Sequence, residues 1–138
     1  MRLYRQFGAV LPALDTPRGL VVTLADSDFR EAAVDPAVYE KLTRIAGIIN
    51  GQPGLAVEVD GYASNSEERA YAVRDLLVRD GVPANKITAR SWGDSRPLAS
   101  NATASGRAQN RRVEITISGS AIGDLPYWSK RYSLVPPQ

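Results

Sequence analysis

The sequence predicts a single α/β (α+β) domain, built as a two-layer sandwich in which helices cover one face of a mixed four-stranded sheet. The first observation behind this prediction is an alternation of strand-like and helix-like segments along the chain. The second is that both helical segments carry start and stop signals. The third is that 138 residues with 43% hydrophobic content are enough for one core. The expected order is strand, helix, strand, helix, strand, loop or short helix, strand, which is typical of this architecture.

Four segments have the composition and spacing of strands. LVVTLA is a short apolar run between turn signals, and LAVEVDGY alternates apolar and polar residues. In RVEITIS the apolar residues also recur at every second position, so they share one face. The segment KITARSW completes the set. We expect strands at residues 20–25, 55–62, 86–92 and 111–117.

Two segments have the pattern of amphipathic helices. The first has Asp35 as a candidate N-cap, Pro36 at the first helical position and Gly51 after its last turn. The second starts at Ser66 as a candidate N-cap, has two glutamates in its first turn and ends at Gly81. We expect helices at residues 36–50 and 66–80.

The two ends of the chain differ from this central pattern. Residues 1–19 are expected to form an N-terminal helical or linker segment. Its apolar residues recur at helical spacing, and Pro12 interrupts the segment near its end. These apolar residues are Leu3, Phe7, Val10, Leu11 and Leu14. Residues 20–118 are the expected domain, and residues 119–138 form an aromatic, proline-bearing tail that is too short for a domain. The N-terminal residues have neither the length of a transmembrane span nor a signal-peptide cleavage pattern.

The composition argues against several classes of function. Seventeen basic and fifteen acidic residues balance too closely for a nucleic-acid-binding protein. The chain has no cysteine and no histidine, which disfavours zinc, haem and catalytic-triad chemistry. Asp26 and Asp28 form a D-x-D pair, but this pair lacks the glycine and distal glutamate of a calcium loop. No phosphate-binding glycine loop or defensible carboxylate pair is present, so we expect no enzyme activity, metal or cofactor.

Two arginines conflict with their local patterns. Arg69 lies in the first turn of the second helix, where the macrodipole disfavours a cation by up to about 1 kcal/mol. Arg111 has the parity of the apolar residues in the last strand. Each has two interpretations: a solvated charge paired with a surface carboxylate, or a cation that holds a ligand carboxylate in a cleft. If both serve a site, their guanidinium groups should lie close together at the rim of the sheet.

The loop DGYASNS, residues 60–66, is the expected neighbour of these arginines. It joins a strand end to a helix start, which is where α/β folds place ligand contacts. The alternative is a plain turn with competing capping residues. Tyr62, Ser64 and Asn65 of this loop are candidate ligand contacts, and Asp28 is the acidic candidate from the earlier segment DSDFREAA.

The C-terminal half resembles a known family. NATASGRAQNRRVEI, residues 101–115, resembles the N-x-T-x-x-G-R-x-x-N-R-R-V-E-I signature of the OmpA-like peptidoglycan-binding domain, also found in peptidoglycan-associated lipoproteins and flagellar stator proteins. The matching residues are Asn101, Thr103, Gly106, Arg107, Asn110, Arg111, Arg112, Val113 and Glu114. SEERAYAVRDLL, starting at Ser66, is similar to the family's S-x-x-R-A-x-x-V-x-x-x-L helix. The resemblance covers roughly residues 20–118.

The resemblance implies a binding site for the peptide stem of the cell wall. The family's S-x-x-R-A arginine, here Arg69, contacts the carboxylate of diaminopimelate, and Arg111 is the natural second cation. The aspartate of the family's G-H-T-D motif contacts the ligand's ammonium. At that motif this chain has Gly61, Tyr62, Ala63 and Ser64, and the segment from there to Arg69 is shorter than usual. The departure removes one charge-assisted contact, worth about 1.5 to 3 kcal/mol.

The expected function is therefore a non-catalytic domain that tethers an outer-membrane or periplasmic protein to peptidoglycan through its diaminopimelate stem peptide. The alternative is a domain that kept the fold, lost wall binding with the aspartate, and serves as a protein-interaction or assembly module with protein partners. A third class, an enzyme acting on the cell wall, would need a carboxylate pair or a metal cluster. The expected location is the periplasm, in association with the outer membrane.

Overall fold

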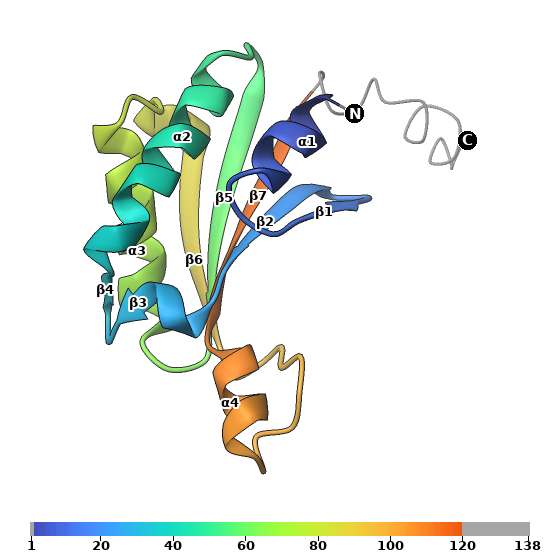
Figure 1. Ribbon diagram of the computed structural model, residues 1–138, viewed down its shortest axis with the longest axis vertical. Coiled ribbons are helices and arrows are strands. Elements are labelled where there is room, and N and C mark those ends of the chain that lie inside the picture. Colours follow the sequence, from blue (N-terminus) through green and yellow to red (C-terminus); the bar gives the residue numbers. More distant parts are fainter. Residues whose placement is uncertain (1, 120–138) are drawn as a thin grey trace.

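The computed structural model describes residues 2–119 and shows a twisted sheet with helices packed against it (Figure 1). The sheet has five strands in the order β1-β2-β7-β5-β6, and a separate two-stranded hairpin is formed by β3 and β4. The elements in chain order are α1 (Arg2–Gly8), β1 (Ala13–Thr16), β2 (Gly19–Leu24), η1 (Asp26–Asp28), β3 (Phe29–Arg30), β4 (Ala33–Val34), η2 (Pro36–Val38), α2 (Tyr39–Asn50), β5 (Leu55–Tyr62), α3 (Ser66–Arg79), η3 (Ala84–Lys86), β6 (Ile87–Gly93), α4 (Ala104–Asn110) and β7 (Arg112–Gly119), where η denotes a 3₁₀ helix.

The sheet is mixed, as the sequence predicted. β5 and β6 are parallel and are joined by α3, whereas β7 lies antiparallel between β5 and β2. The register pairs Val59 with Ile115 on β7, and Ile115 pairs in turn with Val22 on β2. Because side chains alternate along each strand, these three residues and their neighbours at every second position point to the same face.

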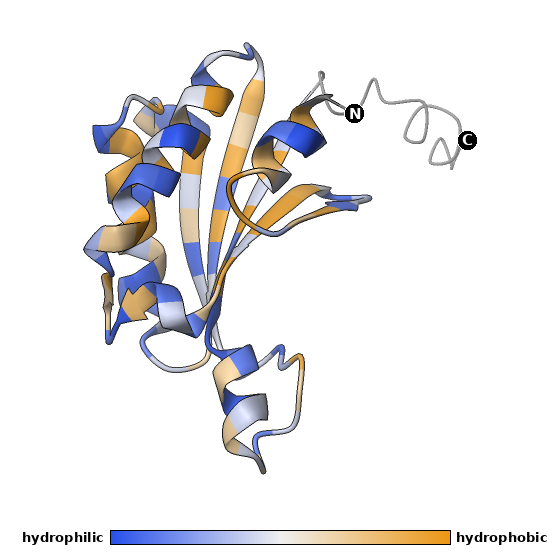
Figure 2. Ribbon diagram, in the orientation of Figure 1, coloured by the Kyte–Doolittle hydropathy of each residue, from blue (hydrophilic) through white to orange (hydrophobic). Residues whose placement is uncertain are grey.

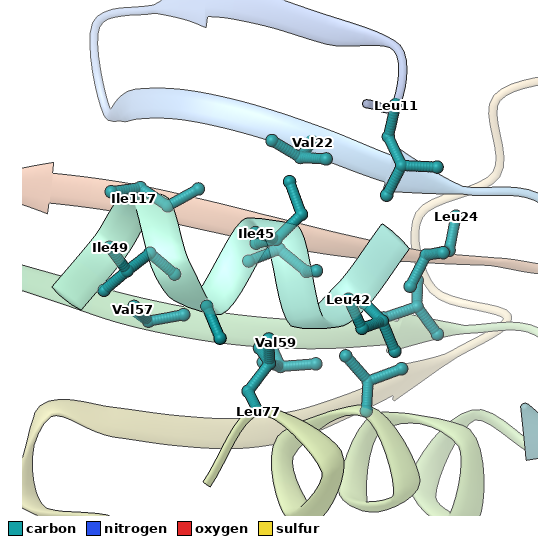
Figure 3. Packing of buried hydrophobic residues seen from close by; sticks show 14 of the residues in the cluster. Leu11, Val22, Leu24, Leu42, Ile45, Ile49, Val57, Val59, Leu77 and Ile117 are labelled. Atoms are coloured by element: carbon teal, nitrogen blue, oxygen red, sulfur yellow. The ribbon is translucent and has the colours of Figure 1, made fainter. Parts of the chain in front are cut away.

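That face carries the core. Helices α2 and α3 lie side by side against the sheet, and α1 packs on the same face beside α2 (Figure 1). Figure 3 shows Leu42, Ile45 and Ile49 of α2 above Val57 and Val59 of β5, with Leu77 of α3 beside them. The ribbon coloured by hydropathy alternates between polar and apolar residues along the helices, consistent with one buried and one solvated face (Figure 2).

All four predicted strands and both predicted helices are present, and the fold class is confirmed. Asp35 caps the start of the first predicted helix, at η2, because its Oδ1 accepts a hydrogen bond from the backbone N–H of Ala37 at 3.0 Å. Pro36 opens a 3₁₀ turn that leads into α2, and Gly51 is the residue at which α2 ends. The expected capping role of Ser66 is wrong: the N-cap is Asn65, and Ser66 is the first helical residue, with its hydroxyl bonded to that of Ser91.

The N-terminal segment is partly helical and joins the sheet. α1 ends at Gly8, and Phe7 and Leu11 are buried in the core. Leu14, expected on the apolar side of a helix, lies instead on the edge strand β1 with 64% of its surface exposed. Residues 1–19 therefore contribute a fifth strand that the sequence pattern did not predict.

The remaining differences are short elements. The stretch expected as a loop or short helix before the last strand contains α4, and residues 29–34 form the β3–β4 hairpin. The aromatic tail at 120–138 lies outside the described residues. Among residues 2–119, no helix has the length and apolar character needed to cross a lipid bilayer.

Candidate ligand-binding site

Three charged side chains from distant parts of the chain meet at one point beside the start of α3. Arg69 Nη1 donates a hydrogen bond to Asp26 Oδ1 at 3.0 Å. Arg111 Nε donates to the same oxygen at 3.1 Å, and Arg111 Nη2 lies 3.3 Å from Asp26 Oδ2. Two guanidinium groups therefore share one carboxylate. The expectation that Arg111 lies near Arg69 is confirmed, and we call Asp26, Arg69 and Arg111 the arginine-pair site.

Arg69 reaches this site because α3 starts very close to the end of β5. A Cβ at Gly61 would stand 2.8 Å from the carbonyl carbon of Ser66 and closer still to its oxygen, so only glycine lets the first turn of α3 approach the strand. Asn65, just before the helix, takes a left-handed conformation with φ of 58°. That conformation suits asparagine better than most residues, and it turns the chain sharply into α3.

The β3–β4 hairpin covers Arg69 from the other side. Arg69 Nε donates to the backbone carbonyl of Glu31 at 2.6 Å, and its guanidinium lies 4.6 Å from the centre of the Phe29 ring. Glu31 has a positive φ of 56°, a conformation that a residue with a side chain adopts at some cost. The charge-assisted bond from Arg69 stabilises this turn. Arg69 thus holds the hairpin and Asp26 together.

Arg111 is delivered by α4 and the loop before it. Thr103 caps α4 by accepting a hydrogen bond from the N–H of Gly106 at 2.9 Å. The buried Asn110 closes the loop, because its Oδ1 accepts from the N–H groups of Leu98 and Ala99 at 2.7 and 2.9 Å. The asparagine, threonine and glycine of the N-x-T-x-x-G-R-x-x-N-R-R motif therefore build the loop and helix that place Arg111.

The two consecutive arginines of that motif serve different surfaces. Arg111 turns toward Asp26, whereas Arg112 is the first residue of β7 and stacks over the ring of Tyr62, 3.9 Å from its centre. Because side chains alternate along the strand, Arg112 lies on the sheet face opposite the core residue Val113. Only the first of the pair belongs to the arginine-pair site.

The electrostatics of the site favour an anion. Partial burial acts to raise the pKa of Asp26, but hydrogen bonds and charge from Arg111 and Arg69 outweigh it and lower that pKa below the ordinary 3.8. Asp26 is therefore ionised at neutral pH, and the three side chains together carry one net positive charge. The side chain of Arg69 is only 5% exposed, whereas Arg111 and Asp26 are each 30% exposed. An incoming ligand meets Arg111 and Asp26 first, with Arg69 behind them.

The structure brings only some of the predicted site residues together. Ser64 and Asn65 are exposed in the loop before α3. Tyr62 is buried on the opposite face of the sheet under Arg112, and so it faces away from the arginine-pair site. Asp28 serves the local turn, because its Oδ2 accepts from the backbone N–H of Ala25 at 2.9 Å.

Asp26 is the site residue that sequence reasoning missed. It was considered only as a cation ligand with Asp28, and within residues 2–119 no three acidic side chains gather as a metal ion would require. Its partners are 43 and 85 residues away in sequence. The only signal was indirect: two arginines in unfavourable local positions need an anion, and Asp26 follows directly after the end of the first predicted strand.

The geometry can recognise a small zwitterion without doing chemistry on it. The unused N–H donors of Arg111 can bind a carboxylate, and the exposed part of Asp26 can accept from an ammonium. The site holds no nucleophile beside a base, and its one carboxyl group is shifted toward the ionised state. Its components therefore fit binding rather than catalysis.

Comparisons with known proteins identify the family of this chain. Residues 28–111, more than half of the chain, match the model of the OmpA family. Outer membrane porin F of Pseudomonas fluorescens is 38% identical over 104 residues, which is 68% of this chain and 32% of that protein. Peptidoglycan-binding protein ArfA of Mycobacterium bovis is 40% identical over 97 residues, 63% of this chain and 30% of that protein.

A solved structure extends the likeness to the fold. The cell wall anchor of the T6SS from Pseudomonas aeruginosa superposes with a TM-score of 0.75 at 31% identity, covering 85% of this chain and 97% of that one. The matched region spans about a third of the two curated relatives named above. By the family match over residues 28–111, the chain belongs to the OmpA family, whose peptidoglycan-binding domains are not enzymes.

Proposed function

We propose that this chain is a non-catalytic cell-wall binding domain that tethers an envelope protein to peptidoglycan through the diaminopimelate end of the stem peptide. The observation that carries the proposal is the convergence of Arg69 and Arg111 on Asp26. Three segments far apart in sequence are folded so that two cations and one anion meet at a partly exposed point. Such an arrangement matches a group that carries both a carboxylate and an ammonium.

In this proposal Arg111 binds the ligand carboxylate and Asp26 binds the ligand ammonium. Arg111 has the more accessible guanidinium of the two arginines. Asp26 supplies the anion that the serine at position 64 does not. Arg69 contributes positive charge and fixes the position of Asp26 through the 3.0 Å hydrogen bond. The loss of the family aspartate is thereby compensated from another part of the chain.

The relatives support this proposal and its location. One matched protein is named peptidoglycan-binding, one is an outer membrane porin, and one structure is a cell wall anchor. We infer a place in the periplasm, in association with the outer membrane or the cell wall. The parent protein and any protein partners remain part of the proposal, because the match covers only a fraction of those relatives.

The test is co-sedimentation of the purified chain with isolated cell-wall sacculi. We expect the wild type to pellet with sacculi and free diaminopimelate to release it. Arg111→Ala should weaken the affinity for sacculi at least tenfold, because a charge-assisted contact of about 1.5 kcal/mol or more is lost. Arg74→Ala is the matched control, because it also removes one positive charge. Arg74 lies on α3 and pairs with its exposed neighbour Asp75 instead of Asp26.

Two results would contradict the proposal. If the wild type stays in the supernatant while circular dichroism shows it folded, the domain has lost wall binding and the interaction-module function takes its place. If Arg111→Ala and Arg74→Ala lower binding equally, the effect is one of net charge and the arginine-pair site is not the binding site.

A further inference from the structure

A second group of charged side chains lies on the face of the sheet opposite α1, α2 and α3. Its members alternate with the core residues along β5, β6 and β7, or reach over from the β1–β2 turn. We call it the outer-face cluster: Arg18, Glu58, Asp60, Tyr62, Arg90, Trp92, Arg112 and Glu114. Asp60 is at its centre, with a side chain that is 0% exposed. The proposed peptidoglycan site uses none of these residues.

Asp60 is a buried carboxyl group with few hydrogen-bond partners. Its Oδ1 accepts from the indole N–H of Trp92 at 3.0 Å, whereas its Oδ2 has no hydrogen-bond partner. The two nearest cations are beyond hydrogen-bond distance: Arg90 Nε is 3.6 Å from Oδ1, and Arg18 Nη2 is 3.9 Å from Oδ2. One neutral donor is poor compensation for a buried negative charge. The environment therefore favours a proton on this carboxyl group.

Among the charged groups around Asp60, the cation Arg18 lies near both carboxyl groups without a hydrogen bond to either. The titratable and charged groups that face Asp60 are Glu58 and Tyr62 on β5, Arg90 on β6, Arg112 and Glu114 on β7, and Arg18 at the β1–β2 turn. Arg90 is bonded to Glu58, and Arg112 is bonded to Glu114 at 2.8 Å. The guanidinium of Arg18 makes no hydrogen bond within residues 2–119. Its Nη2 lies 4.0 Å from Glu58 Oε2 and 3.9 Å from Asp60 Oδ2, so a short movement would bring it into a direct hydrogen bond.

We propose that the buried Asp60 carboxyl group holds a proton, and that loss of this proton to water draws Arg18 onto Asp60 and ties the β1–β2 turn to the centre of the sheet. Only a proton is exchanged with solvent, and the net charge of the cluster falls by one. In the protonated state the partly exposed guanidinium of Arg18 stays 3.9 Å from Asp60 Oδ2. In the ionised state its guanidinium closes the gap to Oδ2 and makes a direct hydrogen bond.

The pKa shifts of Asp60 and Glu58 agree with a proton on Asp60. Burial raises the pKa of Asp60 to about 6, and the negative charge of Glu58 acts in the same direction, against the lowering effect of Trp92 and Arg90. For Glu58, burial acts in the same upward direction, but the hydrogen bond from Arg90 and the positive charges of Arg90 and Arg18 lower the pKa below its ordinary 4.5. The proton therefore resides on Asp60 and the negative charge on Glu58.

The direct test is an NMR titration of the side-chain carboxyl carbons in the wild-type chain. We expect the Asp60 resonance to titrate with a midpoint near pH 6 and the Trp92 indole N–H to move with the same midpoint. A Trp128→Phe variant identifies which of the two indole signals belongs to Trp92. An Asp60 midpoint below about pH 4.5 would overturn the proposal that this buried carboxyl group holds a proton.

Two variants test the movement of Arg18. Asp60→Asn should abolish the pH response of both the Trp92 indole and the amides of the β1–β2 turn, whereas Asp75→Asn on the exposed face of α3 should leave both intact. Arg18→Gln should keep the Asp60 titration but remove the response of the turn. If the amides of the β1–β2 turn respond to pH equally in Arg18→Gln and in the wild type, the proposed movement of Arg18 onto Asp60 is refuted. If Asp60→Asn does not fold, the wild-type titration and Arg18→Gln still decide.

Discussion

Replacing Asp26 with asparagine should destabilise the fold at neutral pH and much less in acid. The carboxylate accepts from Arg69 Nη1 at 3.0 Å and from Arg111 Nε at 3.1 Å, and the guanidinium of Arg69 is almost fully buried. Asparagine keeps one acceptor oxygen but loses the charge, so Arg69 is left without its anion. A hydrogen bond to a charged group contributes about 1.5 to 3 kcal/mol. Because Asp26 is 30% exposed and partly screened, we expect a loss of about 2 kcal/mol in the free energy of unfolding.

The pH dependence gives this prediction its sharpest form. The pKa of Asp26 in the folded chain is lowered from 3.8, so its stabilising effect is complete above that value and is lost as the pH falls through the folded pKa. Wild type and Asp26→Asn should therefore converge as the pH falls through the folded pKa of Asp26, which lies below the ordinary 3.8.

Urea unfolding followed by far-UV circular dichroism, at neutral and at acidic pH, measures the loss of unfolding free energy and its pH dependence. Asp75→Asn is the control, because Asp75 is 67% exposed and should change the free energy of unfolding by less than about 0.5 kcal/mol. The reasoning is refuted if Asp26→Asn equals the wild type at neutral pH, or if the gap between them persists unchanged in acid.

Three further substitutions test how the site is built. Gly61→Ala should lower the free energy of unfolding by about 3 kcal/mol, since its Cβ would collide with the backbone of α3, whereas Gly47→Ala, with open space around it, should raise it by up to about 1 kcal/mol in the same urea assay. Asn110→Ala should cost about 3 kcal/mol by calorimetric melting, because two backbone N–H groups of the preceding loop lose their shared acceptor; a change below about 1 kcal/mol would contradict that role. Ser64→Asp should tighten diaminopimelate binding roughly two- to fivefold by isothermal titration, because Ser64 is exposed and a new carboxylate there is solvated; unchanged binding would show that position 64 does not face the ligand.

The regular elements were predictable because their signals are local. Alternation in LAVEVDGY and caps at Asp35 and Gly51 each lie within one segment. β1 has no such signal: its single large apolar residue, Leu14, is exposed, and the strand exists because its backbone pairs with β2. α4, with the sequence ASGRAQN, has no apolar stripe, and its capping threonine and the buried Asn110 hold it in place. Tertiary contacts determine these elements.

The site was predictable to the extent that its residues break local rules. Arg69 lies in the first turn of a helix, where the macrodipole disfavours a cation, and Arg111 occupies a strand position where the pattern predicts an apolar residue. Both positions indicated a cation that needs a neighbouring anion. Asp26 broke no rule, because an aspartate after a strand is an ordinary turn residue. Only the fold brings it to both arginines. Tyr62 is the converse: its place in the loop before α3 suggested a ligand contact, but the pleat of β5 turns it to the opposite face under Arg112.

The central claim is that the arginine-pair site binds the diaminopimelate end of a stem peptide. The most direct measurement is an NMR titration of the ¹⁵N-labelled chain with diaminopimelate, with lysine as the comparison because lysine lacks the second carboxylate. The account predicts saturable shifts in the backbone amides of Asp26, Arg69 and Arg111, weaker ones with lysine, and their loss in Arg111→Ala. Shifts centred elsewhere on the chain, or equal shifts with lysine and diaminopimelate, would contradict it.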